Sequence, residues 1–225
     1  MKKNNLLILL IVLFPLGFLL FFGKALNHKF RTLPYYHPAE MLLERTNNEL
    51  GKTYFIPEYS FTNANGNTVS RETLPADAVC LFAPYSMNSE YLAVITKRLL
   101  SATHKYKDET NIKIIGLNSD GFVQDADKLK DYMYNLNKNR DQSENFLYLS
   151  SSSKETMAKF IEALGIKNID NSALIVLVDP NNQIRGRYNL NAERQINDAI
   201  GDIALLRKEI SDGKYKAKKV LRDNN

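Results

Sequence analysis

The stretch SALIVLVDPNNQIRGRYN, residues 172–189, gives the clearest indication of the fold. Residues 173–178 are an unbroken apolar run, which is typical of a strand that is buried on both faces of a sheet. The next residues, 179–183, are rich in Asp, Pro and Asn and predict a turn. The stretch therefore predicts a hairpin. Arg185 and Arg187 in its second strand are expected to pair with acids, to face a partner or to lie on a solvated face.

Upstream of this hairpin, short apolar runs alternate with amphipathic segments. The earliest segment, residues 54–70, alternates roughly between apolar and polar residues and contains Asn65-Gly66, which is a strong hairpin signal. Ser153 suits a helix N-cap, and Gly165 suits the position after a helix end. Further strands are predicted at 78–83, 112–119 and 145–150, and helices at 87–103, 125–139, 153–164 and 192–210. This order predicts an α/β sandwich with a mixed sheet and an N-terminal β-hairpin.

Residues 6–23 are a different kind of segment, with 18 uncharged and almost wholly apolar residues. As a helix they would extend about 27 Å, close to the thickness of the hydrocarbon core of a bilayer. No clear cleavage site follows, so we expect an uncleaved transmembrane signal anchor, with a cleaved signal peptide as the alternative. The flanking Lys and Arg residues do not decide its orientation.

The charge distribution argues against a nucleic-acid-binding protein. The net charge is +5, yet residues 1–31 carry five Lys or Arg and no acid, and residues 214–225 carry five against Asp223. The part between these ends is therefore mildly acidic. Basic ends beside a membrane anchor more often serve topology or lipid headgroups.

These patterns divide the chain into five segments. They are a short N-terminal segment (1–5), the anchor (6–23), a polar connector (24–53), a folded domain (54–212) and a basic tail (213–225). The chain has one cysteine, Cys80, so it forms no internal disulfide and no cluster of thiolate ligands. A lone cysteine in an apolar strand is most often a small core residue.

The sequence resembles the SCO/SenC family, membrane-anchored thioredoxin-like proteins of cytochrome oxidase assembly. The resemblance covers residues 54–209 and is carried by four segments: 56–70, 112–133, 171–189 and 200–210. It implies a thioredoxin-like α/β sandwich with one N-terminal transmembrane helix. It also implies a bacterial inner membrane location, a single pass, and a C-terminal domain on the periplasmic face.

Function in that family rests on a Cys-x-x-x-Cys motif and a distant histidine, which bind copper and exchange electrons. In this sequence the resemblance places the two cysteine positions at Tyr85 and Ser89 and the histidine position at Asn171. Neutral oxygens and an amide are poor ligands for Cu(I). We therefore expect a degenerate site with no catalytic residue and no cofactor, in which the Tyr85 ring fills the old ligand pocket and its hydroxyl bonds Asn171.

The resulting hypothesis is a non-catalytic protein that binds lipid through its anchor and binds a respiratory oxidase subunit or another SCO-like protein. The alternative is a copper chaperone or thiol-disulfide oxidoreductase with relocated ligands, for which Cys80 and Met87 are the candidates. A third hypothesis is a peroxide-reducing thiol enzyme. It needs an exposed cysteine of low pKa at a helix start, whereas Cys80 precedes the predicted helix on a strand.

Overall fold

The structure is a computed structural model that describes residues 32–36, 54–63, 65–86, 91–120, 145–167 and 173–212. The apolar span 6–23, the predicted helix 125–139 and the basic tail 213–225 lie outside these residues. Within the described ranges, no helix combines the length and the apolar character needed to cross a membrane. Residues 33–225 form one unit, which is described here by itself.

Seven strands of the described chain form one mixed sheet in the order β2-β1-β5-β4-β3-β6-β7. The three central strands β3, β4 and β5 are parallel, and the outer strands are antiparallel to their neighbours. The strands are β1 (Ser60–Asn63), β2 (Thr68–Ser70), β3 (Val79–Tyr85), β4 (Ile112–Asn118), β5 (Phe146–Ser150), β6 (Leu174–Val178) and β7 (Ile184–Asn189). The predicted mixed sheet is confirmed, as is the first hairpin, where Gly66 takes the positive φ of 81° that its turn requires.

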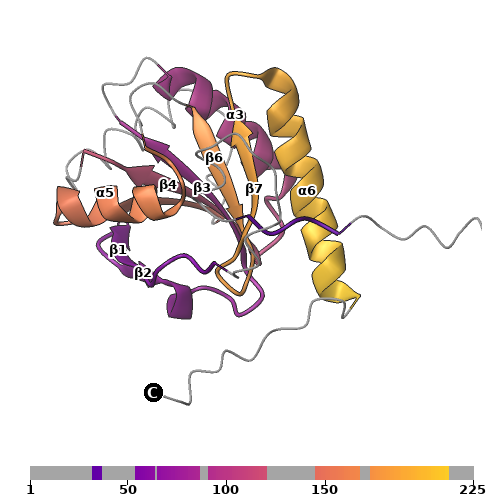
Figure 1. Cartoon of the computed structure of the whole chain (residues 1–225), viewed down its shortest axis with the longest axis horizontal. Coiled ribbons are helices and arrows are strands. Elements are labelled where there is room, and N and C mark those ends of the chain that lie inside the picture. The colour runs from indigo at the N-terminus through magenta and orange to yellow at the C-terminus, as the bar shows by residue number, and fades with distance from the viewer. Residues whose placement is uncertain are drawn as a thin grey trace, which may run out of the picture. The chain divides into compact units, whose positions relative to one another are not determined.

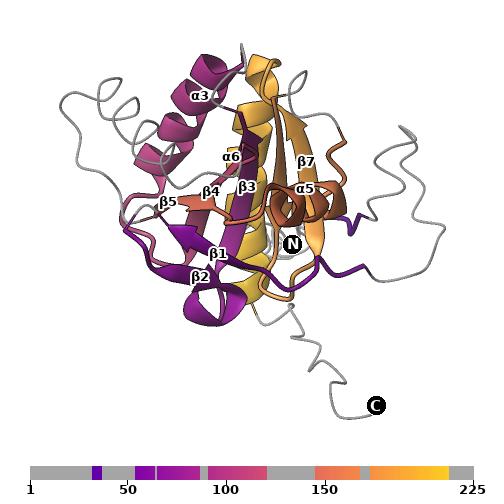
Figure 2. The same ribbon diagram turned by 90° about the vertical axis from the view of Figure 1, so that its left-hand side faces the viewer.

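Helices cover both faces of this sheet. The described helices are α3 (Leu92–Lys105), α5 (Lys154–Ala163) and α6 (Glu193–Ser211), with a short 3-10 turn η2 (Arg71–Thr73) after β2. Figures 1 and 2 show α5 on one face and α3 and α6 on the other. Ser153 caps α5 by accepting a hydrogen bond from the Thr156 amide at 3.2 Å, and Gly165 follows the helix with a φ of 79°. Both predicted helix ends are thus confirmed.

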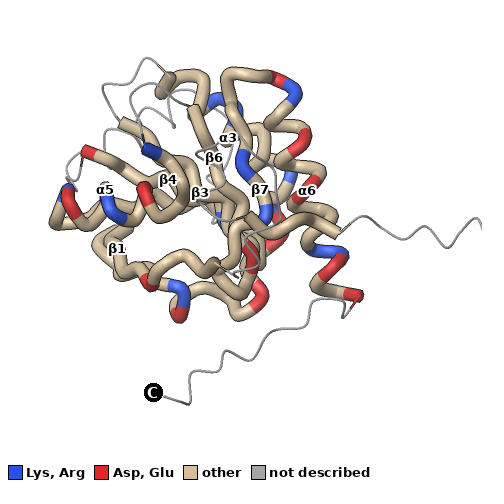
Figure 3. Tube along the Cα trace, in the orientation of Figure 1, with Lys and Arg blue, Asp and Glu red and all other residues tan. Residues whose placement is uncertain are grey.

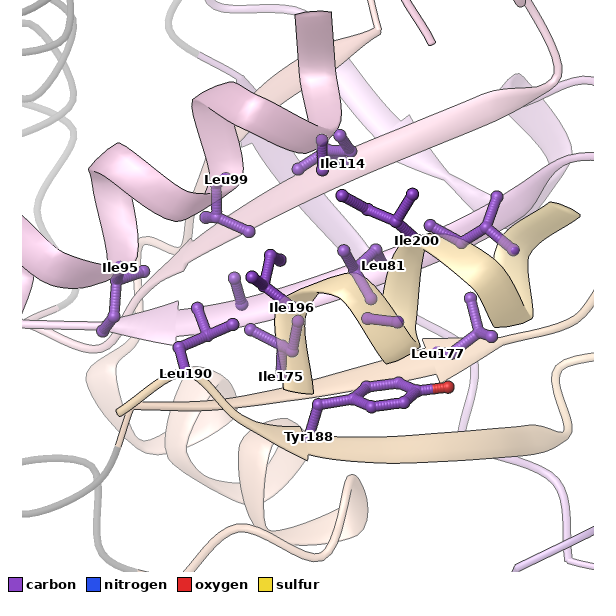
Figure 4. Close-up of a cluster of buried hydrophobic side chains, with 14 of the residues drawn as sticks. Leu81, Ile95, Leu99, Ile114, Ile175, Leu177, Tyr188, Leu190, Ile196 and Ile200 are labelled. Atoms are coloured by element: carbon purple, nitrogen blue, oxygen red, sulfur yellow. The ribbon is translucent and has the colours of Figure 1, made fainter. Parts of the chain in front are cut away.

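The two sheet faces form two separate cores, because side chains alternate along each strand. On β3, Leu81 and Tyr85 face α3 and α6, whereas Cys80 and Phe82 face α5 and the first hairpin. Figure 4 shows the first core, where residues of α3 and α6 meet over the sheet. Its labelled members include Ile95, Leu99, Ile196 and Ile200 from the helices and Leu81, Ile114, Ile175 and Leu177 from the strands.

A β-bulge in the last hairpin redirects one charged side chain. Leu177 pairs with Gly186 and Val178 pairs with Ile184, so Arg185 is an extra residue between two ladder pairs. A bulge re-aims the side chain of its extra residue. Arg185 consequently turns toward α6, where its guanidinium lies 2.8 Å from Glu209 and is 1% exposed.

Part of the predicted connector packs onto this same hairpin. The Tyr36 amide donates to the Ile184 carbonyl at 3.0 Å and forms an isolated antiparallel bridge. Leu33 is buried in the first core. The Ile56 amide donates to the Asn182 carbonyl at 2.8 Å. Residues 33–36 therefore belong to the folded unit, although the sequence patterns place its start at Tyr54.

Candidate functional site

Tyr85, the predicted site position that the structure describes, lies at the edge of the sheet where β3 and β4 end and β6 begins. β3 and β4 run parallel, with Tyr85 opposite Asn118, and β6 runs antiparallel to β3. Carboxyl ends of parallel strands are where α/β proteins usually place their binding sites. This edge is therefore the candidate site of the chain.

Only one of the three predicted ligand positions lies in the described part of the chain. Tyr85 is described, whereas Ser89 and Asn171 lie outside the described residues, as does Met87. The predicted bond between the Tyr85 hydroxyl and Asn171 therefore stays a prediction. β3 ends where the antiparallel strand β6 begins. The segment after β3, which contains Met87 and Ser89, and the segment before β6, which contains Asn171, are therefore both joined to this edge of the sheet.

Tyr85 is a core residue at this edge. Its side chain is 2% exposed and belongs to the core beneath α3 and α6. A β-carbon added to Gly116 on the neighbouring strand would lie 3.1 Å from Cε1 of the Tyr85 ring, so the ring packs directly on that glycine. The pocket around the ring has free space for about one water molecule. It is lined by Tyr85, Leu92, Ile95, Thr96, Leu99, Gly116, Phe146 and Tyr148. The Tyr85 ring thus lies in an apolar pocket. That this pocket is the old ligand site stays a prediction.

A set of polar groups fixes the ends of β3 and β4 to each other. The amide and the hydroxyl of Ser119 both donate to the Tyr85 carbonyl at 2.9 Å. The Ser86 hydroxyl lies 3.0 Å from Asp120 Oδ2, to which it donates. The Asp120 amide donates to Asn118 Oδ1 at 3.0 Å. These bonds hold the backbone of the candidate site in one arrangement.

The sequence interpretation did not single out Ser86, Asn118 and Ser119. Ser86 is 3% exposed, Asn118 is 0% exposed and Ser119 is 8% exposed. Each ends or directly follows an apolar strand, and a polar residue at the carboxyl end of a buried strand could have identified it. The carboxylate of Asp120 is bonded within this group.

Cys80 lies on the opposite face of the sheet from Tyr85. The two residues are five positions apart on β3, an odd number, so their side chains point to opposite faces. Cys80 is 2% exposed and packs in the core beneath α5 and the first hairpin. Nη1 of the Arg71 guanidinium lies 3.9 Å from the Cys80 Sγ.

The surroundings of Cys80 disfavour its thiolate. Burial raises the pKa of the Cys80 thiol to about 11, and Arg71 opposes this shift only in part. Because the thiolate is the nucleophile and the metal ligand, a thiol with this pKa is a poor candidate for either role at neutral pH. Cys80 thus lacks both the exposure and the low pKa that a reactive cysteine needs.

The described part of the candidate site does not fit copper. The family resemblance implies two thiolates and an imidazole, which are soft or intermediate ligands. In their place the described residues offer the phenol of Tyr85, which is buried among apolar side chains. Among the described residues, no group of three or more His, Cys, Asp or Glu side chains is placed to hold a metal ion.

Comparison with known proteins identifies the fold. No protein-family model matches the sequence. No curated protein matches it either. Among solved structures, the chain is similar to BsSco, a member of the Sco family of cytochrome c oxidase assembly proteins, with a TM-score of 0.55 and 20% identity over 68% of this chain and 94% of that one. It is also similar to an SCO1/SenC family lipoprotein from Bacillus anthracis, with a TM-score of 0.52 and 18% identity over 69% of this chain and 96% of that one.

A third similar structure is not described as an SCO protein. It is the thioredoxin domain of a thiol-disulfide oxidoreductase from Bacteroides vulgatus, with a TM-score of 0.50 and 20% identity over 66% of this chain and 95% of that one. The predicted structural resemblance to SCO/SenC proteins is therefore confirmed, and the fold is thioredoxin-like. At these identities the similarity establishes the fold, and the function has to be argued from the residues of this chain.

Proposed function

We propose that this protein is a membrane-anchored relative of the SCO/SenC proteins that binds other proteins during the assembly of a respiratory oxidase. Residues 6–23 hold it in a bacterial inner membrane as a single-pass protein, with the folded domain on the periplasmic face. Its partner is an oxidase subunit or another SCO-like protein. It uses neither dithiol nor copper chemistry.

The observation that supports this proposal most strongly is the burial of Tyr85. At the position where the family resemblance implies the first cysteine, the side chain is 2% exposed and packs against Gly116 beneath α3. A phenol in this place supplies no thiol for disulfide exchange and no soft ligand for copper. The fold is that of the SCO proteins, but position 85 is occupied by a core side chain. We therefore assign the protein-binding activity to the surface of the domain.

The position of Cys80 counts against a relocated copper or thiol site. Such a site would need Cys80 to reach the same edge as Met87, which follows β3. Cys80 instead faces the core beneath α5, with an elevated thiol pKa of about 11. A binding role that does not involve this thiol is the simpler account.

Deletion of the gene, followed by complementation, tests the proposal. Loss of the protein should lower cytochrome oxidase activity in membranes of the bacterium that carries it, and the full chain should restore that activity. Cys80→Ala should restore it equally, since the thiol has no part in the role. A variant without residues 6–23 should restore much less, because it lacks the anchor.

Two outcomes would contradict the proposal. Unchanged oxidase activity after deletion would remove the assembly role. If Cys80→Ala accumulated to normal levels in the membrane and still failed to restore activity, the protein would depend on its thiol, as in the copper chaperone or oxidoreductase alternative.

A further inference from the structure

Two large hydrophobic side chains of the described residues are exposed, and each belongs to the residue before one that is bonded to the last hairpin. They are Tyr35 and Phe55, with exposures of 51% and 41%. Their chain neighbours Tyr36 and Ile56 donate backbone hydrogen bonds to the last hairpin, at Ile184 and Asn182 respectively. We call Tyr35, Phe55 and the turn 179–183 the hairpin corner. Two exposed aromatic side chains in segments bonded to the same hairpin make this corner a candidate binding surface.

A buried ion cluster holds this corner in place. Nη2 of Arg185 donates to the Leu33 carbonyl at 2.8 Å, and Nε of Arg185 donates to the Pro34 carbonyl at 3.2 Å. Glu209 accepts a hydrogen bond from the Leu33 amide at 2.6 Å and pairs with Arg185. The Arg185 guanidinium also lies 4.1 Å from the ring centroid of Tyr35. The segment that carries Tyr35 is thus part of the fold, and the exposure of Tyr35 does not come from a loose end.

A short segment of the sequence joins this corner to the predicted anchor. The apolar span ends at Gly23, and Leu33 is already buried in the domain. Ten Cα steps join these two residues, a distance of at most about 35 Å when fully extended. Three basic residues, Lys24, Lys29 and Arg31, lie between them. Basic residues beside a span are attracted to anionic headgroups in the leaflet that they face.

We propose that the hairpin corner rests on the bilayer surface, with Tyr35 and Phe55 in the interfacial region. Tyrosine and phenylalanine side chains that lie next to a membrane span gain free energy at the boundary between headgroups and acyl chains. The proposal rests on the proposed membrane anchoring. It extends that function by assigning an orientation to the domain.

The orientation has a consequence for the candidate site. Tyr85 ends β3 at the opposite end from the turn 179–183, because Cys80 near the start of β3 pairs with Val178 just before that turn. Along seven strand residues the separation is about 20 Å. With the hairpin corner on the lipid, the Tyr85 edge faces away from the membrane, where a partner can reach it.

Single tryptophan variants of the full chain test this orientation, because the sequence contains no Trp. We would prepare Tyr35→Trp and Phe55→Trp in vesicles of three parts phosphatidylcholine to one part phosphatidylglycerol, with and without brominated acyl chains. The control is Arg194→Trp, whose native side chain is 91% exposed in the first turn of α6. Position 194 lies fifteen residues from Glu209 along α6, or about 22 Å.

The proposal predicts that brominated lipid quenches the emission at positions 35 and 55 and leaves the emission at position 194 unchanged. Flotation of the vesicles tests the anchor separately. If the chain floats but position 35 or 55 is quenched no more than position 194, the orientation is wrong and the anchor stands. Shielding of these two positions from iodide without quenching by brominated lipid would show that protein covers the corner. A chain that does not float would overturn both proposals.

Discussion

The two ends of the sheet have been stabilised in opposite ways. At the Tyr85 edge, the position that the family resemblance assigns to a ligand is occupied by an aromatic ring in an apolar pocket. At the other end, the hairpin contains a buried arginine with two carboxylate partners, Asp179 at 3.2 Å and Glu209 at 2.8 Å. Figure 3 shows that the charges of α6 otherwise lie interspersed along the helix.

This difference shows where the fold depends on specific polar partners. The Tyr85 edge depends on packing, and packing tolerates some change of shape when a ring of similar size remains. The Arg185 cluster depends on complete pairing, because a buried charge that loses its partner keeps its full desolvation cost. Substitutions should therefore separate the two ends by the size and the kind of their effects.

The largest effect is expected for Arg185→Ala. This change leaves Asp179 and Glu209 buried without their cation and frees the carbonyls of Leu33 and Pro34. We expect a loss of about 3–5 kcal/mol in the free energy of unfolding. Chemical denaturation of the purified full chain in detergent measures it.

The matched control is another arginine–carboxylate pair, which lies on the protein surface. Arg194 pairs with Asp198 at 4.0 Å on the exposed side of α6, and its side chain is 91% exposed. For Arg194→Ala the expected loss is at most about 0.5 kcal/mol. Similar losses for the two variants would contradict the claim that the Arg185 cluster stabilises the hairpin corner.

The next effect is expected for Tyr85→Ala. Removing the ring leaves a cavity between Gly116 and α3, which should cost about 3 kcal/mol of stability. Tyr85→Phe keeps the ring and should retain most of that free energy. If Tyr85→Ala unfolded at the same denaturant concentration as the native chain, the ring would not be a core element, and the argument for a filled site would fail.

A smaller effect concerns the pH dependence of stability through Cys80. Burial raises the pKa of this thiol from 9.0 to about 11, so the folded state favours the neutral form. The stabilisation of the folded state by this neutral thiol is therefore complete below pH 9, and it is lost as pH rises from about 9 to 11. Cys80→Ala should remove this part of the pH dependence. Equilibrium unfolding of both chains across that range measures the difference.

Thiol labelling provides an independent check of the same point. In the folded chain at neutral pH, Cys80 should react with a disulfide reagent much more slowly than in denaturant, because the side chain is 2% exposed. Fast labelling of the folded chain would indicate that the thiol reaches solvent. It would also return Cys80 to the list of candidate reactive groups.

Local sequence patterns were sufficient to predict most of the sheet. The apolar run 174–178 is β6, and Asn65-Gly66 lies at the first turn. Ser153 and Gly165 bound α5 where the local signals place them. These features depend on neighbouring residues, whose preferences are readable in the chain itself.

Contacts between distant residues were not predictable in the same way. Arg185 bonds the Leu33 carbonyl across 152 positions, and no pattern around residues 33–36 indicates that this segment joins the fold. The same distinction applies to the candidate site, where some features were predictable from the sequence and others were not. The position of Tyr85 followed from the resemblance to the SCO/SenC family. That Tyr85 and Cys80 point to opposite faces of the sheet follows from their odd spacing on one strand, which can be read from the sequence. The polar partners of Ser86 and Asp120 required the three-dimensional structure.

The most direct test of the central claim is a Cu(I) titration of the full chain in detergent, in competition with a chromophoric chelator. The native chain and Cys80→Ala are compared with a triple variant, Tyr85→Cys, Ser89→Cys and Asn171→His, which restores the ligand types that the resemblance implies. Our account predicts no stoichiometric binding by the first two chains and one tightly bound ion in the third. Stoichiometric, tight binding by the native chain that is lost in Cys80→Ala would contradict it.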